Sequence, residues 1–535
     1  METIQDVQGL QFTPADPDYA KQRDQYASSS YPNAPHMNPG LIVQPFDVAD
    51  IKLVIEHARE NNIAIAIRSG GHQYSGASST SSNNIQLDLR NTFKRRDIDL
   101  KYLPDHPQGP SVRASVSYSL DEFHTFLASN GVFVGHGQCS GVHLGGHVQT
   151  GGYGLLGRSF GLLADSVTSL HIVDHAGVQR EITPGDPSDL FFAILGGSPG
   201  NFGVLTHFVV KVQRDVDHKG SVGMRAVLLY NKEKLATILG YLANTSDDVD
   251  FPRNYDLCVS VMSENCEFSK AMPGLEHKVR RDLDLLKSDP MPPVIFVFAQ
   301  FVSFGDGVTH DPEWFERFEK GSIITTGVET KPVSELMRQW IMPRAREYPF
   351  PYVKRTYCTN SMALSENGWE QWATDRMDAI VAPKNNGQFL VAQLQAFGGK
   401  HSMFARNGDK KSTAFSWRDT TLCMVLDNFH LPENRRDAEA WAQKTDDQAN
   451  GPEGMFSTTD RRVLWGSYGN FNLDAVWRTY YEDEEKYERL KKARVLADPD
   501  GTFTPNSFCV PRAVDSTSRP MWFLGLLRRW VPFMI

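Results

Sequence analysis

Ten glycines fall within the thirty residues from 132 to 161. Glycine lacks a Cβ and destabilises a helix interior by about 1 kcal/mol relative to alanine, so we expect loops and tight turns here and no regular helix. Glycine-rich loops also let backbone N–H groups approach an anionic ligand closely. Gly145-Gly146 and Gly151-Gly152 do not form the G-x-G-x-x-G pattern of a dinucleotide-binding βαβ unit. From the pattern alone, structural turns and an anion-binding loop both stay open.

The composition indicates a folded globular protein that acts on small molecules. Of the 535 residues, 40% are hydrophobic and 22% are charged, which is ordinary usage for a chain of about two to four domains. The 55 basic and 64 acidic residues give a formal charge of −9, which offers little basis for a nucleic-acid surface. We therefore expect a small-molecule substrate and no nucleic acid among the partners.

The cysteines and the two terminal segments indicate in which cellular compartment we expect the protein. The six cysteines, at positions 139, 258, 266, 358, 423 and 509, are too sparse for a disulfide framework, so we expect most to be buried thiols. The first twenty residues lack the basic and apolar parts of a secretory signal, which favours an intracellular, cytoplasmic protein. The apolar segment 519–535 is shorter than the about twenty residues of a membrane span. Packing on its own domain, a homodimer contact and a membrane-surface contact remain open for it.

The first part of the chain alternates helical and strand patterns. Residues 47–62 place apolar side chains on one helical stripe, and the runs that follow are typical of short strands at 63–67, 85–89 and 112–118. Ser119 and Glu122 form a capping-box pattern for a helix that ends at Gly131. We predict that residues 1–216 form a cofactor-sized domain.

The middle of the chain, residues 217–465, has a different pattern. Apolar strand-like runs alternate there with charged, helix-compatible stretches; the strand-like runs are 257–262, 294–304, 389–397 and 420–427, and the stretches include 275–287 and 434–448. This order predicts a substrate-binding domain in which helices cover one face of a sheet. The remaining residues, 466–535, contain a predicted helix at 480–496 that Asp498-Pro499 stops.

Cys139, His143 and His147 offer a competing chemistry. Their spacing of four would place them on one face of a helix as metal ligands, which leaves a non-redox metal-binding protein as the alternative of another class. The interleaved glycines argue against a rigid helix, and no fourth ligand is indicated. His72, taken alone, is more typical of a hydrogen-bonded loop histidine than of a catalyst.

Two segments stand out: Arg68 to Gly76, which contains His72, and Gly137 to Gly154, which contains Cys139. They resemble the segments that attach flavin in the vanillyl-alcohol-oxidase-type FAD enzymes, in particular the berberine-bridge-enzyme-like branch. The first is Arg68-Ser-Gly-Gly-His72-x-Tyr-Ser-Gly76, and the resemblance implies that His72 bonds to the flavin 8α-methyl group. The second runs from Gly137 to Gly154 and implies that Cys139 bonds to flavin C6. A cofactor of this kind would be FAD, held covalently through both residues.

Two further segments extend the resemblance toward the end of the chain. Residues 189–203 are similar to a third family segment, and Tyr468-Gly-Asn470 with the helix after it resembles the family's C-terminal signature. The family fold is α+β, with an FAD-binding domain formed by both chain ends and a substrate domain whose antiparallel sheet is covered by helices. The cofactor-binding residues that the resemblance implies are Arg68, Ser69, Gly70, Gly71, His72, Ser75, Gly76, Cys139, Ser140, Val142, Gly145, Gly146, Gly151, Gly152, Gly154, Asn201, Gly203, Tyr468 and Asn470.

The sequence departs from the family on the substrate side. The usual P-H-R triplet corresponds to Ser416-Trp417-Arg418, and the common Tyr-Tyr-Gly to Tyr480-Tyr481-Glu482. Residues 217–465 resemble the family only loosely, so the substrate is not identified.

The resemblance implies a cofactor but not a base. Flavin accepts a hydride, and the substrate must also lose a proton. The candidates are Tyr468, which the family places beside the flavin, and Asp427 at the end of an apolar run, which is as well explained as a solvated strand-end carboxylate. Arg418 is either an anchor for substrate or flavin, or a surface ion pair.

We expect an FAD-dependent oxidase that oxidises an alcohol, a carbohydrate or a secondary metabolite with oxygen and releases hydrogen peroxide. Val142 lies three residues after Cys139, where the resemblance implies control of oxygen access, and its small size favours an oxidase. A dehydrogenase with another electron acceptor is the alternative.

Overall fold

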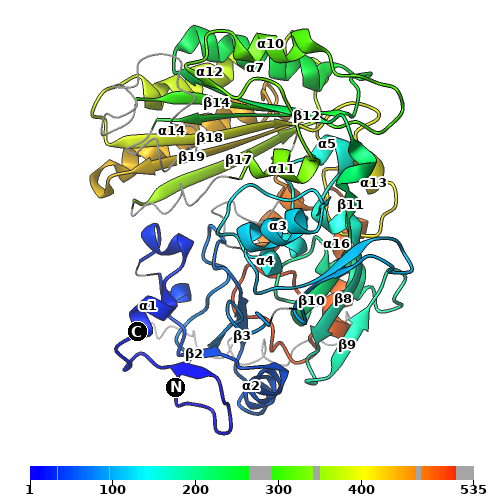
Figure 1. Cartoon of the computed structure of the whole chain (residues 1–535). Coiled ribbons are helices and arrows are strands. Elements are labelled where there is room, and N and C mark those ends of the chain that lie inside the picture. The colour runs from blue at the N-terminus through cyan, green and yellow to red at the C-terminus, as the bar shows by residue number, and fades with distance from the viewer. Residues whose placement is uncertain are drawn as a thin grey trace, which may run out of the picture.

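The computed structural model describes residues 1–32, 34–95, 97–263, 292–341, 350–459, 461–464 and 472–513. Figure 1 shows a large sheet with helices on its outer face in the upper half of the molecule, and smaller sheets in the lower half. The lower half combines N-terminal segments with the helix α16 near the end of the chain. This is the α+β arrangement that the sequence predicts.

The lower half contains two main sheets. One has the order β1 (Leu10–Phe12), β2 (Leu41–Gln44), β4 (Ile85–Asp88), β3 (Ile65–Arg68), with β2 and β3 parallel to β4. The other is antiparallel in the order β5 (Leu100–Leu103), β6 (Ser111–Ser115), β10 (Val204–Lys211), β8 (Val167–Val173), β9 (Gln179–Ile182). A third, two-stranded sheet pairs β7 (Val132–Phe133) with β11 (Gln213–Arg214).

Helices of the lower half follow the sequence signals closely. In α2 (Val48–Glu60), Asp47 accepts from the Ala49 N–H as the N-cap and the predicted apolar stripe is buried. The helix α3 (Leu120–Ser129) begins with the predicted capping box of Ser119 and Glu122. The other helices are α1 (Tyr19–Arg23), α4 (Leu144–Gln149), α5 (Gly157–Phe160), α6 (Leu190–Ile194), α15 (Trp477–Tyr480) and α16 (Glu484–Ala497).

The segment after residue 472 packs into the same hydrophobic core as the N-terminal sheets. Tyr487, Leu490 and Phe503 are buried in one cluster with side chains of β2, β6 and β10. The buried guanidinium of Arg494 donates to the backbone oxygens of Asn201 and Val510 and pairs with Asp498. Both ends of the described chain therefore build one unit.

The upper half is an eight-stranded antiparallel sheet. Its order is β15 (Ile324–Thr325), β12 (Val222–Leu229), β14 (Val294–Phe301), β13 (Tyr255–Met262), β18 (Gln388–Ala396), β19 (Leu422–His430), β17 (Tyr352–Thr359), with β16 (Glu329–Thr330) beside β12. Its helices are α7 (Lys232–Asp247), α10 (Pro312–Glu319), α11 (Val333–Arg338), α12 (Trp369–Val381), α13 (Met403–Gly408) and α14 (Arg435–Ala449).

One face of this sheet is covered by helices, as expected. Trp369 of α12, Leu239 of α7 and Trp441 of α14 pack with the side chains of that face in one cluster. The opposite face is directed at the glycine-rich segment: Gln395 Nε2 donates to the Gly154 carbonyl, and Gln138 Nε2 donates to Cys258 Sγ at 3.7 Å.

Two expectations about helices need correction, and other features fall outside the described residues. Short helices, α4 and α5, do form within residues 132–161, because tertiary packing overrides the low helix propensity of glycine. The predicted helix at 480–496 is two helices, α15 and α16, with a break at 481–483. The stretch 275–287 and the segment 519–535 lie outside the described residues, as does residue 465 at the predicted domain boundary.

Candidate functional site

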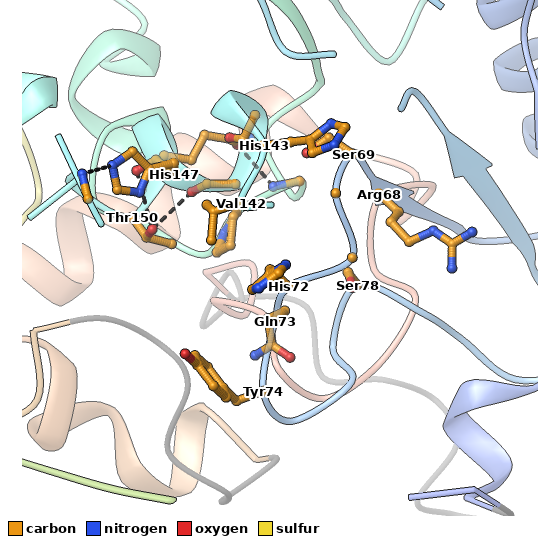
Figure 2. Close-up of a pocket in the computed structure, with 18 of the residues that line it drawn as sticks. Arg68, Ser69, His72, Gln73, Tyr74, Ser78, Val142, His143, His147 and Thr150 are labelled. Carbon is orange, nitrogen blue, oxygen red and sulfur yellow. Dashed lines mark hydrogen bonds between the residues drawn. The ribbon is translucent and has the colours of Figure 1, made fainter. Parts of the chain in front are cut away.

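A cavity lies between the glycine-rich segment and the face of the large sheet opposite α7, α12 and α14. Its walls come from residues 67–74, from parts of 137–154 and 199–201, and from Lys354, Gln393 and Val425 of three adjacent strands. Figure 2 shows the two chain segments of the lower half meeting around it, with His72, Val142 and Tyr74 on its lining.

Most of the predicted cofactor-binding residues line this cavity. Those on its lining are Arg68, Ser69, Gly70, Gly71, His72, Cys139, Val142, Gly145, Gly146, Gly152, Gly154 and Asn201. Ser75, Gly76, Ser140, Gly151 and Gly203 lie in the same segments but not on the lining. Tyr468 and Asn470 lie outside the described residues.

His72 and the Cys139 segment lie side by side. A Cβ added to Gly141 would be 3.4 Å from His72 Cε1, and in Figure 2 the His72 ring lies beside the segment of Val142. The other side of the imidazole stacks on Tyr26, with ring centroids 4.9 Å apart. Cys139 is a half-buried free thiol. The two residues predicted to hold the flavin therefore reach one cavity from two directions.

Arg68 supports the loop rather than the cavity. Its buried guanidinium pairs with Asp88 at 2.6 Å and donates to the backbone oxygens of Gln22 and Arg23. Figure 2 shows the side chain directed away from His72. Arg68 thus ties the N-terminal segment and β4 to the start of the loop that carries His72.

Glycines allow the two loops to approach each other closely. A Cβ on Gly70 would lie 2.7 Å from His143 Cδ2, and one on Gly145 would lie 2.9 Å from Ser69 Oγ. Gly146 differs, because a Cβ there would meet no atom within 4 Å and would project into open space at the cavity lining. Gly146 therefore leaves room that a side chain would fill.

A chain of histidines fixes the backbone just before Cys139. His136 Nδ1 lies 2.8 Å from the Gly137 oxygen, the Gly137 N–H donates to His147 Nε2 at 2.9 Å, and His124 Nδ1 lies 3.2 Å from His136 Nε2. Because a carbonyl only accepts and an N–H only donates, His136 must carry its proton on Nδ1 and His147 must be unprotonated at Nε2. Burial lowers the pKa of His136 to about 4 and, with the His136 charge, that of His147 to about 3. Neutral imidazoles thus hold this loop.

The alternative metal site is not assembled. His143 packs against Gly70, and His147 accepts a hydrogen bond from Gly137, so the two do not converge with Cys139 on one point. Within the described ranges, no group of three or more His, Cys, Asp or Glu side chains is arranged to hold a metal ion. The geometry gives the non-redox metal-binding interpretation no support.

Asp427 differs from the solvated strand-end carboxylate that its sequence position also allowed. It lies inside β19, is fully buried, and accepts from Lys354 Nζ at 2.7 Å. Lys354 of β17 lies directly opposite it in the strand pairing and lines the cavity, whereas Asp427 does not. The carboxylate therefore lies behind the ammonium group as seen from the cavity.

Arg418 joins two parts of the chain that are distant in sequence and does not line the cavity. Its guanidinium pairs with Asp165 at 2.7 Å and donates to the Phe404 oxygen, and the residue is buried. The neighbouring Trp417 donates its ring N–H to the Thr479 oxygen. The surface ion pair considered for Arg418 is thus a buried one that joins the large sheet's loops to the glycine-rich segment.

Sequence reasoning missed Lys354, Gln393 and Tyr26. The strand β17 that carries Lys354 was not among the expected strands, although its residues alternate between the two faces of the sheet. Tyr26 comes from the N-terminal segment, where no local pattern indicates a contact with His72.

Comparisons with known proteins agree with this geometry. A family model described as an FAD binding domain matches residues 39–183. A berberine bridge enzyme-like protein, C-1, from Nicotiana tabacum is 30% identical over 234 residues, which cover 41% of this chain and 39% of the relative. The chain also superimposes on the solved berberine-bridge-like enzyme 1 of Physcomitrella patens with a TM-score of 0.69 over 95% of this chain and 98% of that one, at 15% identity.

The chain carries an FAD-binding domain and has the fold of the solved berberine-bridge-like enzymes. A VAO-type flavoprotein oxidase from Thermothelomyces thermophilus is 26% identical over 264 residues, which cover 48% of this chain and 45% of that protein. The matched regions thus span less than half the length of these two curated relatives. The structural likeness shows the fold of this flavoprotein.

The cavity next to this FAD-binding domain fits FAD. Two buried polar atoms, Asn201 Oδ1 and His143 Nδ1, have no hydrogen-bond partner among the described residues, and both residues line the cavity. Gly146, also on the lining, leaves open space where a side chain would otherwise project. Unpaired buried polar atoms are costly, so a polar ligand with donors and acceptors would complete this site.

Within the described residues, no helix is long and apolar enough to cross a membrane.

Proposed function

We propose that this flavoprotein is an FAD-dependent oxidase that removes a hydride and a proton from an alcohol, a carbohydrate or a secondary metabolite and forms hydrogen peroxide from oxygen. The observation that carries the proposal is the single cavity shared by His72, Cys139 and the charged side chain of Lys354. The name of one relative, a flavoprotein oxidase, supports oxygen as the acceptor.

His72 and Cys139 are the proposed points of covalent attachment. When bound, FAD supplies the acceptor for two electrons. Tyr26, stacked on the imidazole, restricts the rotation of His72, and the histidine chain holds Gly137 two residues before Cys139. Both residues are thereby held in place before attachment, which lowers the entropy cost of forming each bond.

Tyr468 remains the proposed proton acceptor. Asp427, the second candidate, is buried behind Lys354 and does not line the cavity, so it acts on the site by holding the Lys354 ammonium and not by taking the proton directly. Val142, on the cavity lining beside the Cys139 loop, is the proposed controller of oxygen access.

Acid precipitation tests the attachment. Yellow colour should stay in the pellet for the wild type and for His72→Ala and Cys139→Ala, since each single variant keeps one bond. Only the double variant should release its flavin to the supernatant. Cys509→Ala is the matched control, because Cys509 is a buried thiol that does not line the cavity. Complete release from either single variant would contradict two bonds, and a colourless wild type would contradict the flavoprotein assignment.

Oxygen use separates the oxidase from the dehydrogenase alternative. The protein is mixed with a panel of alcohols and aldoses in air, and peroxide is measured with a peroxidase-coupled dye. Peroxide formed in proportion to substrate consumed supports the oxidase. A flavin that stays reduced in air and is reoxidised only by an added quinone or dye acceptor would favour the dehydrogenase.

A further inference from the structure

Lys354 has one hydrogen-bond donor left for a ligand. A lysine ammonium carries three donors. One is used by Asp427 at 2.7 Å, and a second faces the ring of Tyr74, with Nζ 3.8 Å from the ring centroid. Among the described residues no further acceptor contacts Nζ, although the side chain is only 3% exposed and lines the cavity.

The position of the ammonium is fixed by its two contacts, with Asp427 and with the Tyr74 ring. Lys354 and Asp427 are paired residues of adjacent antiparallel strands, so the backbone register sets their separation. The backbone of Tyr74 is held in turn. Tyr352, on the same strand as Lys354, donates its hydroxyl to the backbone oxygen of Tyr74 at 2.7 Å. Tyr74 lies two residues after His72, so the ammonium is anchored to the loop that carries the proposed flavin attachment.

We propose that Lys354 binds an oxygen atom of the substrate through its third N–H. The proposal rests on the proposed function and names its substrate class: molecules that present a hydroxyl oxygen on the reacting carbon or a carboxylate beside it, and not cationic amines. An ammonium at the cavity wall repels a protonated amine and donates to an oxygen. Asp427 is then a positioning residue, because it orients the Lys354 ammonium and offsets the cost of burying its charge.

Arg355, the next residue in the chain, provides a matched control. It also forms an ion pair, from Nε to Asp446 at 2.8 Å, but it does not line the cavity. Successive side chains of a strand point to opposite faces. Arg355→Met therefore removes a cation on the other face of the same strand, and with it the hydrogen bond from Arg355 Nη1 to the Lys354 backbone oxygen, but leaves the Lys354 ammonium and Asp427 in place.

Calorimetric titration of the flavin-loaded protein with sodium benzoate and with benzylammonium chloride tests this assignment without requiring turnover. We expect the wild type to bind benzoate and not benzylammonium. Loss of a hydrogen bond to a charged donor corresponds to roughly a tenfold to hundredfold weaker benzoate binding in Lys354→Met. Lys354→Arg should retain most of the affinity, and Arg355→Met all of it.

A buried carboxylate without its cation endangers folding, so the double variant Lys354→Met/Asp427→Asn removes both charges and carries the test if the single variant fails to fold. Benzoate affinity in that variant equal to wild type would overturn the inference, as would equal wild-type affinity for benzylammonium or no benzoate binding at all. Lysine-dependent binding without turnover of any alcohol would support the inference and refute the oxidase. Turnover of an alcohol that is unchanged by the loss of Lys354 would support the oxidase and refute the inference.

Discussion

Acidification should destabilise this protein through its buried histidines, and His136 allows the effect to be isolated. His136 is fully buried, and burial lowers its pKa from 6.5 to about 4. In the unfolded chain the imidazole takes up a proton near pH 6.5, whereas the folded protein excludes it until about pH 4. The unfolded state therefore binds more protons between these values, and the stability present above pH 6.5 is lost as the pH falls toward the folded-state pKa.

The magnitude follows from the difference between the two pKa values. A difference of about 2.5 pH units at about 1.36 kcal/mol per unit corresponds to roughly 3.4 kcal/mol over the whole transition, from well above pH 6.5 to well below pH 4, of which about 2 kcal/mol is lost by pH 5. Asp256 acts in the opposite direction, because burial raises its pKa to about 6 and protonation then favours the folded state. That contribution is common to wild type and variant, so it cancels in the comparison.

Urea unfolding at pH 7.5 and pH 5 measures the effect. His136→Asn keeps a donor near the Nδ1 position and cannot titrate, so its free energy of unfolding should fall by about 2 kcal/mol less than that of the wild type. Any pH-independent loss of stability caused by the substitution lowers the free energy of unfolding of the variant equally at pH 7.5 and pH 5. It therefore cancels in the difference between the two pH values. The same change at the exposed His401 controls for the loss of an imidazole as such. Equal losses in wild type and His136→Asn would refute the reasoning.

Three further substitutions separate stability from cofactor binding. Arg158→Met leaves four backbone oxygens, those of Phe251, Pro252, Tyr255 and Gly398, without the buried guanidinium, and should cost about 3–5 kcal/mol in urea unfolding. Gly151→Ala places a Cβ 2.4 Å from the Phe415 ring at a φ of +90°, so we expect about 1–3 kcal/mol of destabilisation. Gly146→Val should instead keep the stability of the protein without flavin and lose flavin absorbance, because its side chain enters the cavity.

Local signals made the short-range elements of the lower half predictable. The helix at 48–60 and the capping box at Ser119 depend on contacts within a few residues, and both form as expected. The glycine spacing indicated close approach of the backbone to an anionic ligand, which stays a prediction; Gly70 and Gly145 allow close contact between the two loops. The helix α4 was missed, because packing of Gly145 against Ser69 and Val116 stabilises a turn whose own propensity is unfavourable.

The substrate side could not be predicted in the same way. Lys354 and Asp427 are 73 residues apart, and only the register of β17 with β19 brings them together. A shift of one residue in that register would direct Lys354 away from Asp427 and bring the cation Arg355 to the cavity face. The apolar pattern of β19 identifies the strand but carries no information about its partner, so Asp427 looked like a solvated strand end.

The same register explains why the two halves of the site depend on each other. Lys354 receives its orientation from Asp427 within the sheet and from Tyr74 in the loop of His72, so the substrate wall and the cofactor loop share one side chain. A change that moves the His72 loop, such as loss of Tyr26, should therefore alter ligand binding at Lys354 as well as flavin attachment. Tyr26→Ala tests this coupling: we expect weaker benzoate binding in the calorimeter together with a smaller fraction of flavin in the acid pellet. A change in the flavin fraction with benzoate affinity unaltered would show that the two walls are independent.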